Sequence, residues 1–275
     1  MKLFAHWQWL RALRENPIYL RERGSWGRAN PFYERLASYW PLVAIAALFL
    51  GFCAAGGNPA IVSGNELIIG LWCLLCFPNM LTAVLSLYGS IMLPALTAPS
   101  VSLELDRGTW DILRVAPYSD QTILSAKLLG ALGRLRIWWL LLIVGLIQGL
   151  AAACFFSFSV PGEAVWALAI GPAVVARPLV EVLFAGCLGF YLSTRIRSAT
   201  TALAAAYGGV FVLKLLNSSG TWTLIGRGLA LEEGDQFVMG VVVPAAVYSV
   251  SVLILLQRMS ANVPNKELLY ETANR

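Results

Sequence analysis

The segment LELDRGTWDILRVAPYSDQTILSAKLL, residues 103–129, lies between two long apolar runs and differs from both in composition. It carries four acidic and three basic side chains, whereas the chain of 275 residues is 58% hydrophobic and only 13% charged. Soluble domains are usually about 25% charged. The mean hydropathy is +0.70, and several runs approach or pass the roughly 20 apolar residues that cross a bilayer core of about 30 Å. The sequence therefore predicts an all-α polytopic membrane protein with one compact charged connection.

The apolar runs divide the chain into three regions. Residues 1–38 are mixed in composition, residues 39–257 form a transmembrane domain of six helices, and residues 258–275 form a tail. The connection between the second and third spans covers residues 98–136. The predicted spans are residues 39–56, 67–97, 137–157, a fourth that starts between 164 and 178 and ends near 193, 199–216, and 237–257. The second span rises about 46 Å, so its end projects beyond the bilayer core and carries the charged connection with it.

The distribution of basic residues predicts the orientation. Seventeen of the 20 Lys and Arg residues lie before the first span, between spans two and three, between spans four and five, or after the sixth. Loops rich in Lys and Arg stay in the cytoplasm. We therefore expect a multi-pass protein of the cell membrane (plasma or inner) with both termini cytoplasmic. This orientation accounts for the net charge of +5 without a nucleic-acid partner.

The first 38 residues are too polar to span the membrane. Leu3, Trp7 and Leu10 recur at helical spacing, which is typical of an amphipathic helix lying in the cytoplasmic interface. A solvated basic arm is the alternative. The pairs Asn16-Pro17 and Asn30-Pro31 each place a capping residue before a proline, so each predicts the start of a further helix.

The charged connection contains signals for a short helix between two bends. Gly108 favours the end of the preceding helix, and Thr109 can cap the next one, with Asp111 in its first turn. Pro117 cannot continue that helix. Ser119 then offers the cap of another helix, which runs on towards the third span.

Trp110, Ile112 and Leu113 give the short helix an apolar surface. A helix of one or two turns is rarely stable alone. It needs a docking surface, which is either its own helical bundle or a partner protein.

The connection resembles the signature of type-2 permeases of ATP-binding cassette exporters over about 26 residues without a gap. The matching residues are Glu104, Arg107, Gly108, Thr109, Trp110, Ile112, Leu113, Pro117, Ser119, Ile123 and Lys127-Leu128-Leu129. Tryptophan at position 110 replaces a more usual leucine. The basic N-terminal helix, the six spans and the cytoplasmic ends are similar to the same family over the whole chain.

The resemblance implies that the short helix is a coupling helix seated in a groove of a separate ATPase subunit. Trp110, Ile112 and Leu113 would dock in that groove, while Glu104 and Arg107 would hold the bend by ion pairing. It implies two ATPase copies, which bind ATP and Mg²⁺, and a second permease, identical or related. The alternative is a loop helix packed on its own bundle.

Catalytic and metal-binding patterns are absent from the sequence. No Gly-x-x-x-x-Gly-Lys-Ser/Thr loop occurs, so ATP would be hydrolysed by another chain. His6 is the one histidine, and it has no accompanying cysteine or acidic cluster that would favour a zinc site. We therefore expect no catalytic residue, no metal and no cofactor bound by this chain.

Three charged residues lie in or near apolar spans: Arg177, Glu181 and Lys214. Charges inside the membrane are costly and are candidates for function. Arg177 and Glu181 form either a structural ion pair or a substrate ligand, near mid-membrane or near the outer face depending on where the fourth span starts. Lys214 can snorkel to the headgroups. Residues 217–236 can form an outer interfacial or re-entrant helix.

Small residues four positions apart predict close helix packing, either within one subunit or between subunits. The pairs are Ala185 with Gly189, Ala204 with Gly208, and Ala205 with Gly209.

The sequence thus favours the permease subunit of an ATP-driven exporter that moves a lipid, a hydrophobic drug or a natural product, with membrane lipid around it. The alternative is an ATP-independent secondary transporter or channel that uses Arg177 and Glu181. Inverted repeats are typical of secondary transporters, and the two halves of this chain show no convincing repeat.

Overall fold

The computed structural model describes residues 16–24, 66–115, 118–159, 164–231 and 233–261, together with residues 35, 38, 39, 41, 42 and 45. The described residues are helical and contain no β-strand. The helices are α2 (Pro17–Glu22), α6 (Glu66–Asp106), α7 (Trp110–Arg114), α8 (Asp120–Arg134), α9 (Trp138–Ser159), α10 (Ala164–Ser193), α11 (Ala199–Leu216), α12 (Ser219–Gly228) and α13 (Glu233–Ala261).

Four stretches of helix are long and apolar enough to cross a membrane, or five if α8 and α9, bent by 67° at their junction, form one broken span. The all-helical prediction is thereby confirmed for the described residues, which include helices long and apolar enough to span a membrane. The prediction of six spans is not, because the first, residues 39–56, lies outside the described residues apart from a few isolated positions. The predicted interfacial helix before residue 15, the Asn30-Pro31 helix start and the tail after residue 261 also lie outside them.

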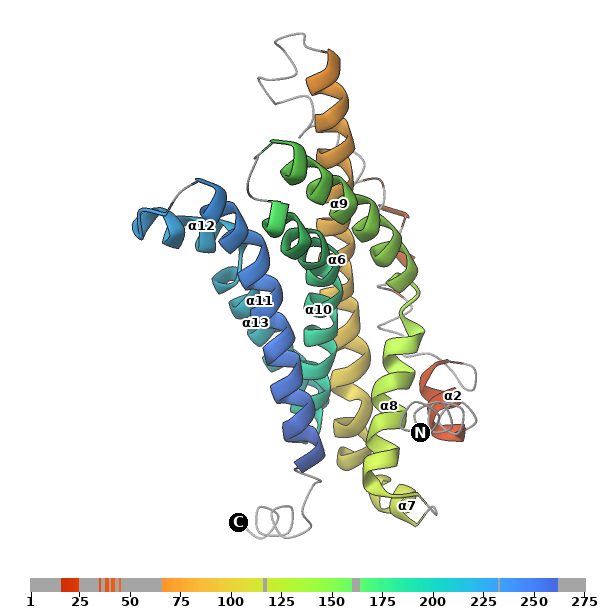
Figure 1. Ribbon diagram of the computed structural model, residues 1–275. Coiled ribbons are helices and arrows are strands. Elements are labelled where there is room, and N and C mark those ends of the chain that lie inside the picture. Colours follow the sequence, from red (N-terminus) through yellow and green to blue (C-terminus); the bar gives the residue numbers. More distant parts are fainter. Residues whose placement is uncertain are drawn as a thin grey trace, which may run out of the picture.

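Helix α10 forms the centre of the bundle and packs against α6, α9, α11 and α13 (Figure 1). It runs without a break from Ala164 to Ser193 and includes Pro172 and Pro178. Of the two predicted starts of the fourth span, the earlier one is therefore correct. Prolines are tolerated in such helices because neighbouring helices and local adjustments satisfy the freed backbone groups.

The α6–α10 contact depends on small residues. A side chain at Gly189 would lie 3.2 Å from the backbone of Pro94, and one at Gly186 would lie 2.5 Å from Leu93. The Ala185–Gly189 pair therefore packs within the subunit. Ser193 completes the contact, because its Oγ accepts hydrogen bonds from the backbone N–H groups of Val101 and Ser102, both at 2.9 Å.

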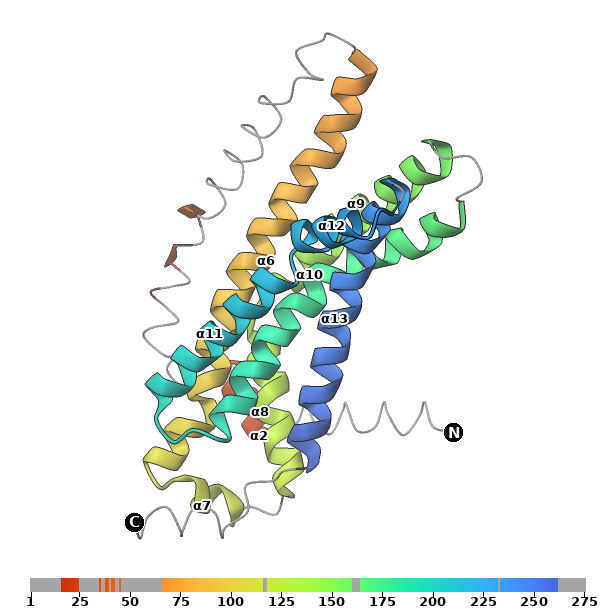
Figure 2. The same ribbon diagram turned by 90° about the vertical axis from the view of Figure 1, so that its left-hand side faces the viewer.

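The helix of the second predicted span extends beyond residues 67–97, as its excess length predicted. Helix α6 continues past residue 97 to Asp106 and contains 41 residues, which corresponds to a length of about 61 Å. Figure 2 shows α6 running along the molecule, with α7 at one end and α12 in the other half. The charged connection therefore begins at the end of a helix much longer than the bilayer core is thick.

Two predicted helix starts are confirmed. Asn16 Oδ1 accepts the N–H of Ile18 at 2.9 Å, and Pro17 opens α2. Ser119 Oγ accepts the N–H of Thr122 at 3.3 Å and caps α8. These side chains satisfy backbone donors that have no partner within the helix.

Candidate functional site

Gly108 ends α6 as the sequence predicts. Its φ angle is +67°, a conformation that glycine adopts without steric cost. The Thr109 N–H donates to Glu104 O at 2.9 Å, and the Gly108 N–H donates to Leu105 O at 3.3 Å. This is a Schellman motif, and it turns the chain sharply before α7.

Thr109 does not cap α7, contrary to the prediction. Its backbone is helical, with φ −84° and ψ −8°, and its side chain makes no capping bond. The Thr109 Oγ1 instead lies 3.4 Å from Glu104 O, in the last turn of α6. The reason is that the Schellman motif places Thr109 against the end of the preceding helix.

Trp110 is buried in its own chain. Its side chain is 2% exposed and belongs to a core cluster with Val101 of α6, Ile123 of α8 and Phe190 of α10. The prediction that Trp110 docks in a partner is thereby corrected. The indole fixes α7 to the bundle instead.

The outer face of α7 carries the exposed apolar groups. Ile112 is 71% exposed and Val115 is 86% exposed, while Leu113 packs partly against the same core as Trp110. At about 100° per residue, Ile112 points roughly opposite to Trp110, and Val115 lies on the Ile112 side. Of the three predicted docking residues, Ile112 is exposed, Leu113 is partly buried and Trp110 is buried; the exposed Val115 was not among the predicted residues. Pro117 lies outside the described residues.

A buried ion network connects the α6–α7 corner to α8 and α2. Lys127 of α8 is 1% exposed, and its Nζ lies 2.8 Å from Glu104 and 3.1 Å from Glu22. The Nζ also donates to the carbonyl of Ser100 at 3.1 Å. Arg21 lies 3.9 Å from the same Glu104 oxygen. Three helices thus meet at one ammonium group.

This network differs from the predicted pairing of Glu104 with Arg107. Arg107 is exposed and is not among the partners of Glu104. Lys127 belongs to the segment that resembles the permease signature. Its position on one helix face with Ile123, Leu124 and Leu128 already indicated that it would be buried. Glu22 carried no comparable signal.

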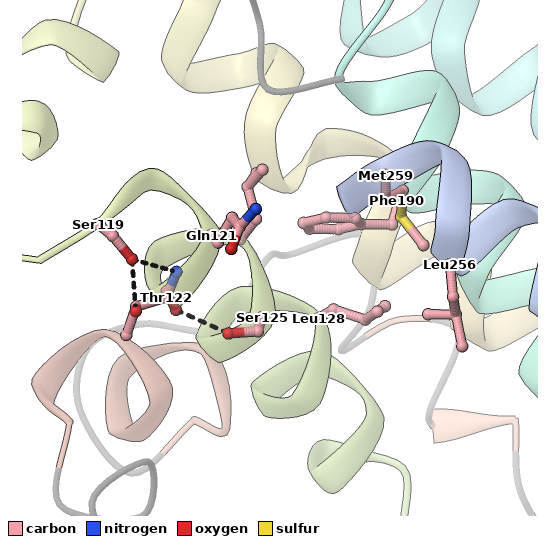
Figure 3. A pocket seen from close by; sticks show the side chains of 9 residues that line it. Ser119, Gln121, Thr122, Ser125, Leu128, Phe190, Leu256 and Met259 are labelled. Atoms are coloured by element: carbon pink, nitrogen blue, oxygen red, sulfur yellow. Dashed lines mark hydrogen bonds between the residues drawn. The ribbon is translucent and has the colours of Figure 1, made fainter. Parts of the chain in front are cut away.

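A groove opens beside the first turns of α8 (Figure 3). Its volume is about 310 Å³. Ser119, Thr122 and Ser125 line one side, and their hydroxyl groups are hydrogen bonded within α8. Side chains of α10 and α13 line the other: Phe190, Leu256 and Met259. The groove lies between the start of α8 and the end of α13.

The charged residues in the spans have partners other than those predicted. Glu181 of α10 is buried and pairs with Lys214 of α11, so Lys214 does not extend alone to the headgroups. Arg177 donates to Ser219 Oγ at the start of α12, and Glu181 acts on Arg177 electrostatically without a direct contact between them. The direct contacts of Glu181 and Arg177 therefore link three helices.

The chain matches no family model, no curated protein and no solved structure. The described part of the chain is all-helical, contains helices long and apolar enough to span a membrane, and carries an anchored short helix at one end of its bundle.

Proposed function

We propose that the chain is the membrane-spanning permease subunit of an ATP-binding cassette exporter. It would act with two copies of a separate ATPase subunit and with a second permease, identical or related. ATP and Mg²⁺ would be bound by the ATPase, because this chain has no phosphate-binding loop. The cargo would be hydrophobic or amphipathic: a lipid, a drug or a natural product. The chain would reside in the cell membrane with both termini cytoplasmic.

One observation carries the proposal: α7 is held rigidly on one side and exposes aliphatic side chains on the other. Trp110 anchors it, and Ile112 and Val115 point away from the bundle. A helix of five residues does not persist without packing. Exposed aliphatic groups on such an anchored helix are typical of a surface that binds another protein.

The ion network supports a coupling role for α7 and the adjoining end of α6. Lys127 joins α8 to the last turns of α6 through Glu104 and to α2 through Glu22. A buried ammonium group resists separation from its carboxylates, because an unpaired charge in the interior is strongly unfavourable. A displacement of α7 by a partner would therefore move α6, α8 and α2 together.

Photo-crosslinking in native membranes identifies the partner. A photoreactive phenylalanine derivative replaces Ile112, and the same group at Leu224, an exposed residue of α12 in the other half of the molecule, serves as the control. We expect the probe at Ile112 to capture a chain that contains a Gly-x-x-x-x-Gly-Lys-Ser/Thr loop, and the probe at Leu224 not to. Crosslinks from Ile112 confined to the chain itself or to lipid would contradict the proposal.

A variant of the same surface measures its contribution to binding. Replacing both Ile112 and Val115 by Asp places charges in the docking surface, so association with the captured ATPase should fall about 30-fold or more. Thermal unfolding should not change, since both side chains are exposed in the isolated chain. Leu224→Asp is the matched control for a charge on an exposed helix. Undiminished association of the double variant would remove α7 from the interface.

A further inference from the structure

A polar cluster lies among the apolar helices far from α7. It consists of Arg177 and Glu181 on α10, Lys214 on α11 and Ser219 at the start of α12. Lys214 pairs with Glu181, and Arg177 donates to the Ser219 hydroxyl. Four side chains from three helices therefore converge where α11 ends and α12 begins.

The cluster is deep along the helix axes. Glu181 and Arg177 precede the end of α10 at Ser193 by 12 and 16 residues, and Lys214 follows the start of α11 at Ala199 by 15. At 1.5 Å per residue these separations are about 18, 24 and 22 Å. The α10–α11 junction lies at the α7 end of the molecule (Figure 2). In a hydrocarbon core of about 30 Å, the cluster therefore lies in the half away from α7.

The charges of this cluster do not balance. Arg177 and Lys214 are cationic and Glu181 is anionic, so the described side chains carry a net charge of +1. Glu181 is in direct contact with Lys214 and acts on Arg177 only at longer range, whereas the direct partner of Arg177 is the neutral Ser219 hydroxyl. An excess charge at this depth is costly.

The neighbouring amide is already satisfied and does not compensate Arg177. Asn217 is buried, its Nδ2 donates to Pro244 O at 2.9 Å, and its Oδ1 accepts from Trp222 Nε1 at 2.8 Å. A guanidinium has five N–H donors, and the bond to Ser219 uses one of them. The remaining donors suit a planar or tetrahedral oxyanion such as a phosphate.

The surface beside the cluster is apolar and exposed. Phe211 and Leu215 flank Lys214 on α11, and Leu224 lies on α12. The Ala199–Gly228 stretch is the least buried of the four candidate spans. Cationic donors next to an exposed aliphatic face match a molecule with an anionic head and acyl chains.

We propose that Arg177, next to the Ser219 hydroxyl, binds the phosphate headgroup of an anionic membrane lipid whose acyl chains lie along α11 and α12. A free phosphate ion does not reach this depth unaided, whereas a lipid brings its phosphate together with its chains. The inference rests on the membrane-spanning character of the chain and is independent of the ATPase partner.

The test compares lipids with the full chain purified in detergent. Phosphatidylglycerol, phosphatidylcholine with the same acyl chains, and inorganic phosphate are added separately. Binding is measured by native mass spectrometry and by the midpoint of thermal unfolding. We expect phosphatidylglycerol to bind and to raise the midpoint, and phosphatidylcholine and inorganic phosphate to have much smaller effects.

Three variants separate the proposed site from general electrostatics. Arg177→Gln brings the net charge of the cluster to zero and should weaken phosphatidylglycerol binding about tenfold or more. The double variant Glu181→Gln with Lys214→Gln keeps Arg177 and the net charge of +1, so it should retain the preference. Arg227→Gln removes one exposed positive charge outside the cluster and should also retain it.

Three outcomes would overturn the proposal. These are wild-type binding of phosphatidylglycerol by the Arg177→Gln variant, an equal loss in the Arg227→Gln variant, and equal protection by inorganic phosphate. Monodisperse elution checks that each variant folds. If the Arg177→Gln variant does not fold, Lys214→Gln, which also brings the net charge to zero, replaces it with the same expected loss.

Discussion

At the scale of single residues, Lys127 has an unusual environment. Its side chain is 1% exposed, and two carboxylates and a carbonyl oxygen lie around its ammonium group. A buried ion pair adds little net stability over apolar packing, but removing one partner leaves the other charge uncompensated. The network therefore acts as a constraint on where α2, α6 and α8 lie relative to each other.

Lys127→Met should lower the free energy of unfolding by about 3–5 kcal/mol, because Glu104 loses its close buried cation and keeps only the exposed Arg21 at 3.9 Å. Adding Glu104→Gln should restore part of that loss. Thermal or denaturant unfolding in detergent measures both. Arg107→Gln removes a positive charge from an exposed position three residues from Glu104 and should change stability by less than about 0.5 kcal/mol. Equal losses in the Lys127 and Arg107 variants would contradict the structural role of the network.

Two glycines provide a matched comparison of backbone geometry. Gly108→Ala should cost about 1–2 kcal/mol, because φ is +67° there and alanine disfavours the left-handed conformation. Gly208 is helical, and nothing lies within 4 Å of a side chain added to it. Gly208→Ala should therefore be neutral or stabilising by up to about 1 kcal/mol. The measurement compares the unfolding midpoints of the Gly108→Ala and Gly208→Ala variants with that of the unmodified chain. A stabilised Gly108→Ala variant would show that the Schellman turn is not formed.

At position 110 the sequence predicted the helix but not the direction of its side chain. Trp110 and Ile112 lie about 200° apart on a helix, so one of them had to face inward. Which one depends on the direction in which α7 leaves Gly108, and that direction is set by the contact with α8 and α10. Glu22, far away in the sequence, was missed for a similar reason.

At the scale of elements, helix ends were predicted better than helix partners. Asn16, Gly108 and Ser119 act locally, through hydrogen bonds to residues two or three positions away. The unbroken course of α10 through Pro172 and Pro178 was left open by the sequence, because the packing of α6, α9 and α13 decides it. The predicted helix within residues 217–236 is present as α12. Its placement at the membrane surface stays a prediction.

Asn217 is expected to hold the corner between α11 and α12. Asn217→Leu leaves Trp222 Nε1 and the Pro244 carbonyl without this partner, so we expect a loss of about 1–3 kcal/mol. Ser251→Ala is the control, because the Ser251 hydroxyl bonds only to Val247 O of its own helix at 2.8 Å. The comparison uses unfolding midpoints in the same detergent. A loss no larger than that of Ser251→Ala would mean that apolar packing alone fixes α12.

At the scale of the whole molecule, composition predicted the all-helical membrane class, and the structure supplies the arrangement of helices around α10. The Ala185–Gly189 pair packs internally, whereas Ala204 and Gly208 face outward on α11. Spacing alone could not distinguish these two pairs, because both have the same period. The orientation across the membrane stays a prediction from the distribution of basic residues.

Cysteine labelling tests that orientation. In a background whose five cysteines are replaced, Val115→Cys beyond α7 and Leu229→Cys beyond α12 place exposed thiols towards opposite ends. A membrane-impermeant maleimide should label Leu229→Cys in intact cells and Val115→Cys only after the membrane is opened. Labelling of both thiols from the same side would contradict the predicted arrangement.

The bend of 67° between α8 and α9 bears on how a movement near α7 would reach α9. Helix α8 contains 15 residues and is about 22 Å long. With its far end at the bend and its near end beside α7, it is shaped as a lever arm. A swing of about 5° about the bend would displace the tip by about 2 Å, which is comparable to the helix shifts by which proteins switch state. A small displacement of the first turn of α8 would thus rotate α8 relative to the start of α9.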